Sequence, residues 1–282
     1  MNGTGPAGGD SERQPLLAVH AGDREDRPST FRSYLARPLS RRRADLVLLL
    51  CYLVTGLLDS TSIAAWGSFV SMQTGNTVYI GLGLAAPTES TRWLKSLTSL
   101  GSFCAGSFLF SRFQRSFGNA PTRRAILLAS FALQAALIVG AACVVTFAPN
   151  PRQPPPKLVT ADEATNELSW PVLLPIALLS LQACGQAAAS RALAYPSLTS
   201  VVLTSIYCDL WGDARLFAGV ADNIERNRRV AAAALLACGA VLGGVFGHME
   251  GNGMAVALWT AAVLKGLAVL AWALWPGEDE ER

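Results

Sequence analysis

Three ionisable side chains occupy segments of this chain that are otherwise apolar. Asp59 follows two leucines in the first apolar segment, Asp209 lies in an apolar segment of the second half, and Lys265 lies near the middle of the last one. A charge at the centre of a bilayer costs on the order of 3 kcal/mol even on insertion scales. A lysine there requires a partner or a water-filled cavity, and the sequence offers it the two aspartates. Such residues mark a solute or ion site, or a purely structural ion pair; a further alternative places Asp209 in the interface beside Asp213 and Arg215.

A short polar run interrupts the apolar sequence after residue 70. Its centre is Thr74, Gly75 and Asn76. Glycine permits unusual dihedral angles and the Asn and Thr side chains can bond freed backbone groups, which favours a broken helix. The alternative is an intact helix that uses the same residues to hold a neighbouring helix. In the second half, Thr204 lies in a comparable interruption.

The composition is that of a membrane protein. The chain has 282 residues, of which 51% are hydrophobic and 15% charged, and its mean hydropathy is +0.33, whereas soluble domains carry about 25% charged residues. The six cysteines show no metal-ligand or CxxC spacing, so we expect no disulfide framework, metal or cofactor. We expect no nucleic-acid partner, and the absence of nucleotide-binding, zinc-protease and nucleophile-elbow motifs predicts that the chain is not an enzyme.

The elements that must position these residues are membrane-spanning helices. Six segments are long enough to cross a hydrocarbon core of about 30 Å: residues 44–66, 93–110, 125–147, 170–190, 230–247 and 254–275. Two more, around 69–86 and 197–217, are apolar but interrupted. The predicted fold is therefore an all-α, polytopic integral membrane bundle, with six spans plus two broken or re-entrant segments, or with eight spans if the interrupted segments cross.

Arginines near the span ends favour the first layout. Arg37 and the run at 41–43 place the N-terminus in the cytoplasm, since Lys and Arg concentrate on that side. Six crossings also put the arginines at 112–124 and 226–229 inside, whereas eight crossings would put the first of these clusters outside. We therefore prefer six spans with two re-entrant segments.

This layout gives two halves of opposite orientation. Gly56 and Gly185 precede the two interrupted segments, and Thr74 and Thr204 fall within them, at separations of 129 and 130 residues. These echoes suggest an inverted repeat, the plan of many secondary transporters, in which discontinuous helices meet near the midplane.

The predicted boundaries follow from composition. Residues 1–40 form a disordered cytoplasmic tail, 41–277 the transmembrane domain and 278–282 an acidic tail; the halves are about 44–147 and 170–275, joined by a Pro-rich extramembrane loop at 148–169. In the N-terminal tail, Glu12, Leu16 and Leu17 resemble an acidic dileucine sorting signal, so a sorting adaptor is one predicted partner and the alternative is a chance pair of leucines. The predicted location is the plasma membrane or an endosomal or vacuolar membrane.

A glycine stripe marks the segment before residue 248. Gly239, Gly243 and Gly247 follow one another at intervals of four and place a flat groove on one helix face, where another backbone can approach closely. We expect packing between helices, and the same face could join two copies of the chain in a homo-oligomer.

Several separated motifs resemble a known family. GLLD at 56–59 and GSFVSMQTGNT at 67–77 are similar to the hallmark of the YoaK-like membrane family, domain-of-unknown-function family 1275. CGQAAASRAL at 184–193, VLTSIYCDL at 202–210 and RNRRVA at 226–231 resemble its fungal branch, although members often repeat TGN where this chain has TSI at 204–206. The resemblance, from about 42 to 275, implies a polytopic membrane protein and no particular substrate.

The leading functional hypothesis is a secondary transporter or permease for a small solute. Its predicted site is Asp59, Thr74, Gly75, Asn76, Thr204, Asp209 and Lys265. The competing hypothesis is a structural or regulatory membrane protein in which these residues only pack helices, and a channel is a third. The lipid bilayer is the partner common to all three.

Overall fold

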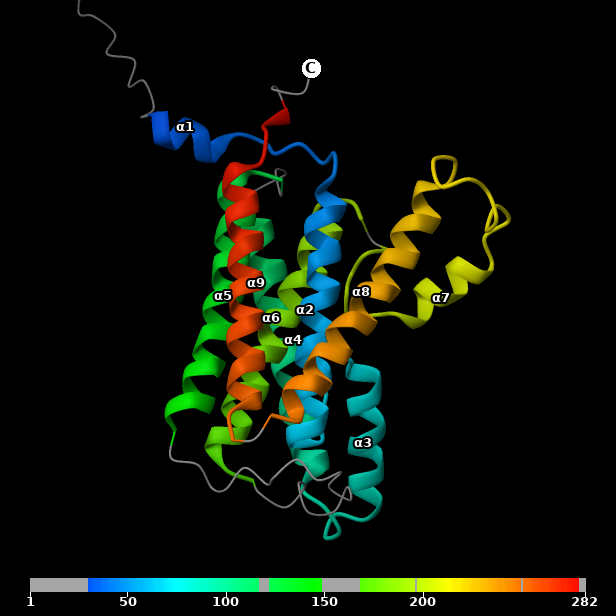
Figure 1. The fold of residues 1–282 in the computed structure, drawn as a ribbon. Helices are drawn as coiled ribbons and strands as arrows, with labels where there is room; N and C mark the ends of the chain where they lie inside the picture. Colours follow the sequence, from blue (N-terminus) through cyan, green and yellow to red (C-terminus); the bar gives the residue numbers. More distant parts are fainter. Residues whose placement is uncertain (1–29, 117–121, 149–167, 196, 250, 279–282) are drawn as a thin grey trace, which may run out of the picture.

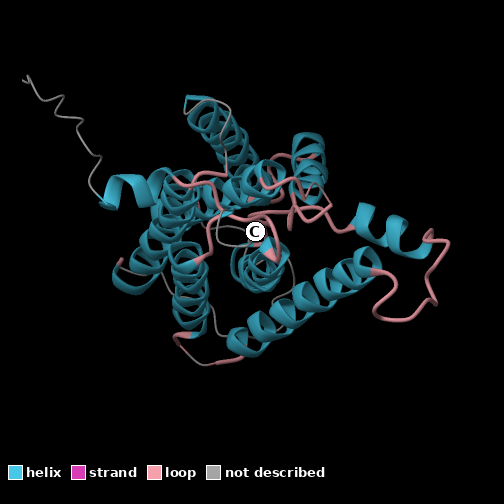
Figure 2. Ribbon diagram, turned by 90° about the horizontal axis from the view of Figure 1, so that it is seen from above, coloured by secondary structure: helices cyan, strands magenta, loops and turns pink. Residues whose placement is uncertain are grey.

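The fold was analysed in a computed structural model that describes residues 30–116, 122–148, 168–195, 197–249 and 251–278. The predicted dileucine signal at 12–17, most of the Pro-rich loop and the last four residues lie outside this part of the chain. The described residues form helices and loops, with two isolated bridges and no strand (Figure 2). Their helices are α1 (Thr30–Ala36), α2 (Ala44–Trp66), α3 (Gln73–Ala85), α4 (Arg92–Ser116), α5 (Arg124–Phe147), α6 (Trp170–Ala192), α7 (Thr204–Trp211), α8 (Ile224–Gly247) and α9 (Gly253–Leu274).

Five helices, α2, α5, α6, α8 and α9, are both long and apolar enough to cross a bilayer. Helix α4 runs alongside them for 25 residues, but its sequence is more polar. Helices α3 and α7 have only 13 and 8 residues. At 1.5 Å per residue they reach about 20 Å and 12 Å, less than a core of about 30 Å. The all-helical membrane bundle is confirmed, with six long helices of which five are apolar enough to cross, and α3 and α7 are too short for the alternative of eight full spans.

The short helix α3 belongs to a re-entrant hairpin. Helix α2 ends at Gly67, whose φ of 74° is the left-handed conformation that glycine adopts without strain. The chain then turns back along α2, starts α3 inside the bundle, and returns to the end of the bundle where α4 begins (Figure 1). Helix α7 differs, because it lies on the outer side of α8 (Figure 1) and most of its residues are exposed.

Packing between the helices follows the predicted two-fold plan. Helix α2 packs along α8, and α4 packs along α6, while α5 packs along α9. Exchanging the first half (α2 to α5) for the second half (α6 to α9) maps these pairs onto one another. Because α2 and α6 run in opposite directions (Figure 1), this arrangement supports the inverted repeat.

Glycines make the closest of these contacts. A Cβ atom on Gly56 would lie 2.0 Å from the carbonyl oxygen of Leu236, and one on Gly239 would lie 2.1 Å from that of Leu53. At Gly243 a Cβ would lie 2.0 Å from Ser60 Oγ, whereas Gly247 has no neighbour within 4 Å. The predicted packing role is confirmed for Gly239 and Gly243, which face α2 in the same chain. A homo-oligomer through this stripe stays a prediction that rests on Gly247.

Residues 30–40, assigned to the tail by composition, are ordered against the bundle. They form α1 and pair with the start of α5 and the end of α9 through bridges from Pro38 to Arg123 and from Leu39 to Gly277. Leu39 is buried in the core. The helix ends that carry the arginine clusters at 112–115, 124 and 226–229 lie at this same end of the bundle (Figure 1), as the six-span layout requires.

Candidate functional site

Two clusters of buried polar side chains lie inside the bundle. We call the one around Asp59 and Asn76, beside the start of α3, the loop cluster. We call the one around Lys265 and Gln186, between α9, α6 and α2, the lysine cluster. Asp59, Asn76, Gln186 and Lys265 are all at most 3% exposed. In a medium without water such groups must bond to one another or to the backbone.

In the loop cluster, Asp59 holds the backbone that leads into α3. Its Oδ1 accepts the N–H groups of Val70 and Ser71, each at 2.9 Å, and its Oδ2 accepts the hydroxyl of Ser71. The carboxylate therefore lies beside the N-terminal end of α3, where a negative charge is favoured by the helix dipole.

Asn76 holds the other side of the same loop. Its Oδ1 accepts the N–H of Phe69 at 3.1 Å and the hydroxyl of Ser68 at 3.2 Å. Its Nδ2 donates to the carbonyl of Phe69 at 2.8 Å and to Ser99 Oγ at 2.9 Å. Ser99 on α4 in turn bonds Ser180 on α6 at 2.8 Å. The amide thus ties the broken segment to both halves of the molecule.

In the lysine cluster, the Nζ atom of Lys265 donates to Oε1 of Gln186 at 2.7 Å. The sulfur of Cys51 lies 3.9 Å away, and the ring of Phe131 lies 4.9 Å from Nζ to its centroid. None of the ion pairs formed by the described residues involves Lys265. A fully buried amine is therefore held by an amide, a thiol and an aromatic face, and by no carboxylate of the described chain.

Gln186 is oriented by two hydroxyl groups. Its Nε2 donates to Thr55 Oγ1 at 3.0 Å and to Ser200 Oγ at 2.8 Å. Because both amide protons are used in this way, the carbonyl oxygen is left to face Lys265. Ser200 belongs to the loop between α6 and α7, so the cluster joins that loop to the interior of the bundle.

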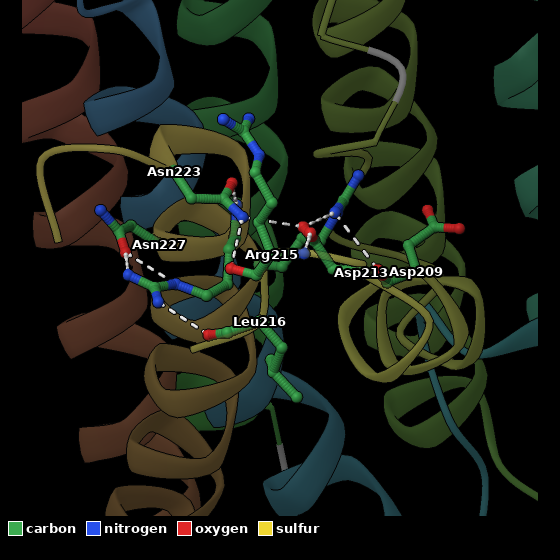
Figure 3. Close-up of polar contacts among 8 residues, drawn as sticks. Asp209, Asp213, Arg215, Leu216, Asn223 and Asn227 are labelled. Atoms are coloured by element: carbon green, nitrogen blue, oxygen red, sulfur yellow. Dashed lines mark hydrogen bonds and ion pairs between the residues drawn. The ribbon is translucent and has the colours of Figure 1, made fainter. Parts of the chain in front are cut away.

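The predicted partners of Lys265 are wrong for a geometric reason. Asp59 is eight residues beyond Cys51 on α2, which is about 12 Å along a helix, and its carboxylate is occupied by the α3 loop. Asp209 is exposed on α7. Its backbone carbonyl accepts Arg229 at 3.2 Å, while its carboxylate is directed away from the contacts of Asp213 (Figure 3).

Asp209 borders a polar network that fixes the turn from α7 into α8 (Figure 3). Asn223 caps α8 by accepting the N–H of Arg226 at 3.0 Å, and its Nδ2 donates to Asp213 at 3.1 Å. Bonds to the backbone N–H of Arg215 and to the Asn223 amide lower the pKa of Asp213 below its usual value. This network is separate from both buried clusters.

The other predicted residues do not join a common site either. Thr74 and Thr204 are exposed at the starts of α3 and α7. Gly75 packs against the ring of Phe69, where a Cβ would lie 2.8 Å from a ring carbon. The structure therefore brings Asp59 and Asn76 together in the loop cluster and places Lys265 in the lysine cluster. Within the described ranges, no three His, Cys, Asp or Glu side chains gather where they could hold a metal ion.

Comparison with known families identifies the family of this chain. The model of a family described as protein of unknown function (DUF1275) matches residues 47–271. The chain belongs to the DUF1275 family. No curated protein and no solved structure matches it significantly. The DUF1275 match covers both clusters and all five apolar helices in large part, so this member of the family is a multi-pass membrane protein.

Three buried glutamines of this DUF1275 chain were not among the predicted site residues. Gln134, Gln182 and Gln186 are at most 1% exposed. Their signal was an amide inside an apolar span, a weaker indication than a charge, because amides are also common in helix contacts. For Gln134 and Gln182 the buried Oε1 atom has no hydrogen-bond partner among the described residues. Lys95 on α4, 1% exposed, is a second buried lysine that was not singled out.

Proposed function

We propose that this protein is a secondary transporter for a small solute, with its binding site in the lysine cluster. The observation that carries the proposal is the complete burial of Lys265 in the middle of an apolar helix with an amide, and no carboxylate, as its partner. Replacing a buried charge by an apolar residue of similar size is often neutral or stabilising. We therefore attribute the presence of Lys265 to a solute that binds to it and dissociates.

The backbone of the loop beside the lysine cluster has features that favour a change of conformation. The loop between α6 and α7 holds two non-glycine residues with left-handed dihedrals, Ala194 with φ of 63° and Ser200 with φ of 58°. Such strain is typical of segments that take part in function. Above this loop lies a groove of about 460 Å³ lined by Arg41, Tyr195, Ser197, Glu225 and Arg228 among others. Because Ser200 bonds Gln186 at 2.8 Å, a shift of this loop would also disturb the partner of Lys265.

The short helix α3 fits the same mechanism. It starts part-way along the bundle and leaves it at the end away from α1, whereas α7 lies on the outer side of α8 (Figure 1). In transporters with inverted repeats, discontinuous helices of this kind surround a central site that opens to each side in turn. We place the N-terminus in the cytoplasm, and the membrane is the plasma membrane or an endosomal or vacuolar one, with Glu12, Leu16 and Leu17 as the adaptor signal.

The test is uptake by the purified full-length chain in proteoliposomes, offered a panel of small carboxylates, amino acids, sugars and polyols. We expect at least one solute to accumulate against a gradient. The variant Lys265→Met should slow its uptake by about tenfold or more, equivalent to about 1.4 kcal/mol, and Asp209→Asn should leave uptake unchanged. If no solute moves, or if Lys265→Met transports at the normal rate, the proposal fails. Steady conductance without accumulation would indicate a channel.

The alternative of a structural or regulatory membrane protein has one specific observation in its favour. Asp59 and Asn76 are fully engaged with the backbone of a single loop, so these two residues stabilise the fold. Under this alternative Asp59→Asn and Lys265→Met should each lower thermal stability, and the parent chain should transport no solute.

A further inference from the structure

Two buried amide oxygens lie one helical turn from the contacts of Lys265. Gln134 follows Phe131 by three residues on α5, and Gln182 precedes Gln186 by four on α6. Residues at these spacings share a helix face. Neither Oε1 atom has a partner among the described residues.

The helix directions put both amides on the same side of Lys265. Helix α5 runs away from the α1 end and α6 runs toward it (Figure 1). A later residue on α5 and an earlier one on α6 therefore lie at the same level, farther from α1 than Lys265. Gln134 lies against α6, since a Cβ on Gly185 would be 2.9 Å from its Cδ atom.

The remaining helices contribute small side chains at this level. Helix α2 runs in the direction of α5, and Thr55 lies one turn beyond Cys51 on it. On α9, which runs back toward α1, the residues one turn before Lys265 are Ala261 and Ala262, both buried. The buried groups at and next to the level of Lys265 thus include a cationic donor, a hydroxyl, and two acceptors that lack donors among the described residues.

These groups define the chemistry of a complementary solute. The ammonium of Lys265 attracts an anionic group, while the oxygens of Gln134 and Gln182 require hydrogen-bond donors. An ammonium group on the solute would supply donors but would be repelled by the charge of Lys265. A neutral hydroxyl group supplies donors without that penalty.

We propose that the solute is a small hydroxycarboxylate, whose carboxylate pairs with Lys265 and whose hydroxyl donates to Gln134 or Gln182. This inference rests on the proposed transport function for its biological meaning, but it can be tested by binding alone.

The experiment compares three probes on the purified full-length protein in detergent. L-Lactate carries both groups, propionate lacks the hydroxyl, and lactamide lacks the charge. We expect lactate at saturating concentration to raise Tm by about 5 °C, propionate to raise it by less, and lactamide to leave it unchanged. Equal shifts from lactate and propionate would overturn the role of the amides, and no shift from lactate would overturn the inference.

Substitutions distinguish the contact of the carboxylate with Lys265 from the contact of the hydroxyl with an amide. Either Gln182→Leu or Gln134→Leu, according to which amide accepts the hydroxyl, should reduce the lactate shift to that of propionate while leaving the propionate shift intact. Lys265→Met should abolish both shifts, with Asp209→Asn as the unchanged control. The Tm without ligand shows that each variant is folded, and lactate shifts that persist in all three variants would refute the site.

Failure of this inference differs from failure of the transport proposal. Lactate that binds in a Lys265-dependent manner but is not taken up by proteoliposomes would leave the site standing and refute transport. Lys265-dependent uptake of neutral or cationic solutes, without stabilisation by lactate, would leave transport standing and refute the hydroxycarboxylate.

Discussion

Asp59 and Asn76 bond adjacent residues of one loop from opposite sides. Oδ1 of Asp59 accepts the N–H of Val70 at 2.9 Å, and Oδ1 of Asn76 accepts the N–H of Phe69 at 3.1 Å. Together with the bond from Asn76 to the Phe69 carbonyl, the two side chains satisfy four backbone groups of the loop between α2 and α3. This pairing is what allows a helix to start inside the bundle, where no water can solvate the chain.

We therefore predict that Asp59→Ala destabilises the protein by about 2–5 kcal/mol, because it leaves two buried N–H groups without acceptors. Asp59→Asn should cost less, since the amide oxygen can still accept from Val70 and Ser71. Thermal unfolding in detergent would measure both. The matched control is Asp209→Ala on an exposed carboxylate, which we expect to stay within about 0.5 kcal/mol of the parent; equal effects at both positions would contradict the role of Asp59.

Packing of α2 on α8 yields a second prediction. A methyl group at Gly239 would lie 2.1 Å from the backbone carbonyl of Leu53, so Gly239→Ala should force the helices apart and destabilise the protein by about 1–3 kcal/mol. Gly244 is in the same helix with no neighbour within 4 Å. Gly244→Ala should be neutral or stabilising by about 1 kcal/mol, because alanine favours the helix.

The same pair of variants tests the glycine stripe as an oligomer contact. Size-exclusion chromatography with light scattering should give Gly239→Ala and Gly244→Ala the oligomeric state of the parent. A state that changed with Gly247→Leu, while thermal stability stayed constant, would support association through the exposed end of the stripe. A change in oligomeric state with Gly239→Ala alone would contradict an internal role for that residue.

The sequence predicted the fold well because apolar length and arginine position are strong local signals. Both follow from the thickness and charge asymmetry of the bilayer. The interruption was predicted at Thr74 to Asn76, but these residues are helical in the first turn of α3, and the non-helical turn lies just before them at residues 67–72. The boundary between the N-terminal tail and the packed chain was harder to predict, because Leu39 is held by contacts with helix ends that are distant in the sequence.

The partner of Lys265 could not be predicted, because it depends on the axial offset between neighbouring helices. Periodicity shows which face of α9 carries the lysine, but it does not show which residues of α2 and α6 lie at the same height in the bundle. Charge alone suggested Asp59, whereas the contact is the neutral Gln186. A search for amides as well as charges within the spans would have included it among the candidates.

Topology can be tested by cysteine labelling in oriented vesicles, with the six native cysteines replaced. A cysteine at Thr88, after α3, should label from the same side as one at Asn252, between α8 and α9, because both turns lie at the end of the bundle away from α1 (Figure 1). A cysteine at Gly219 should label from the other side. If Thr88 and Gly219 label together, α3 crosses the membrane and the re-entrant hairpin is refuted.

The turn between α7 and α8 should respond to acid. The pKa of Asp213 is lowered from 3.8, first by the N–H of Arg215. A lowered pKa in the folded state means that the carboxylate stabilises the turn at any pH above its unfolded value and that this contribution disappears as the pH falls through the lowered value. Hydrogen exchange at the Arg215 amide, relative to its intrinsic rate, should therefore be slow at neutral pH and become faster as the pH falls through the lowered pKa. Asp213→Ala should exchange rapidly at both, and an unchanged pH profile in that variant would refute the role of Asp213.

Lys265 and Gln186 should respond asymmetrically to substitution if the lysine serves a solute and not the fold. Lys265→Met removes a buried charge and replaces it with an apolar chain of similar length, so we expect unfolding to be unchanged or harder by about 1–4 kcal/mol. Gln186→Leu leaves the amine without its acceptor at 2.7 Å, and should destabilise the protein by about 3 kcal/mol. Adding Lys265→Met to Gln186→Leu should then restore most of that loss, which a double-mutant cycle of thermal unfolding would measure. A large loss from Lys265→Met alone would show that the lysine holds the bundle together, and the structural alternative would then account for both clusters.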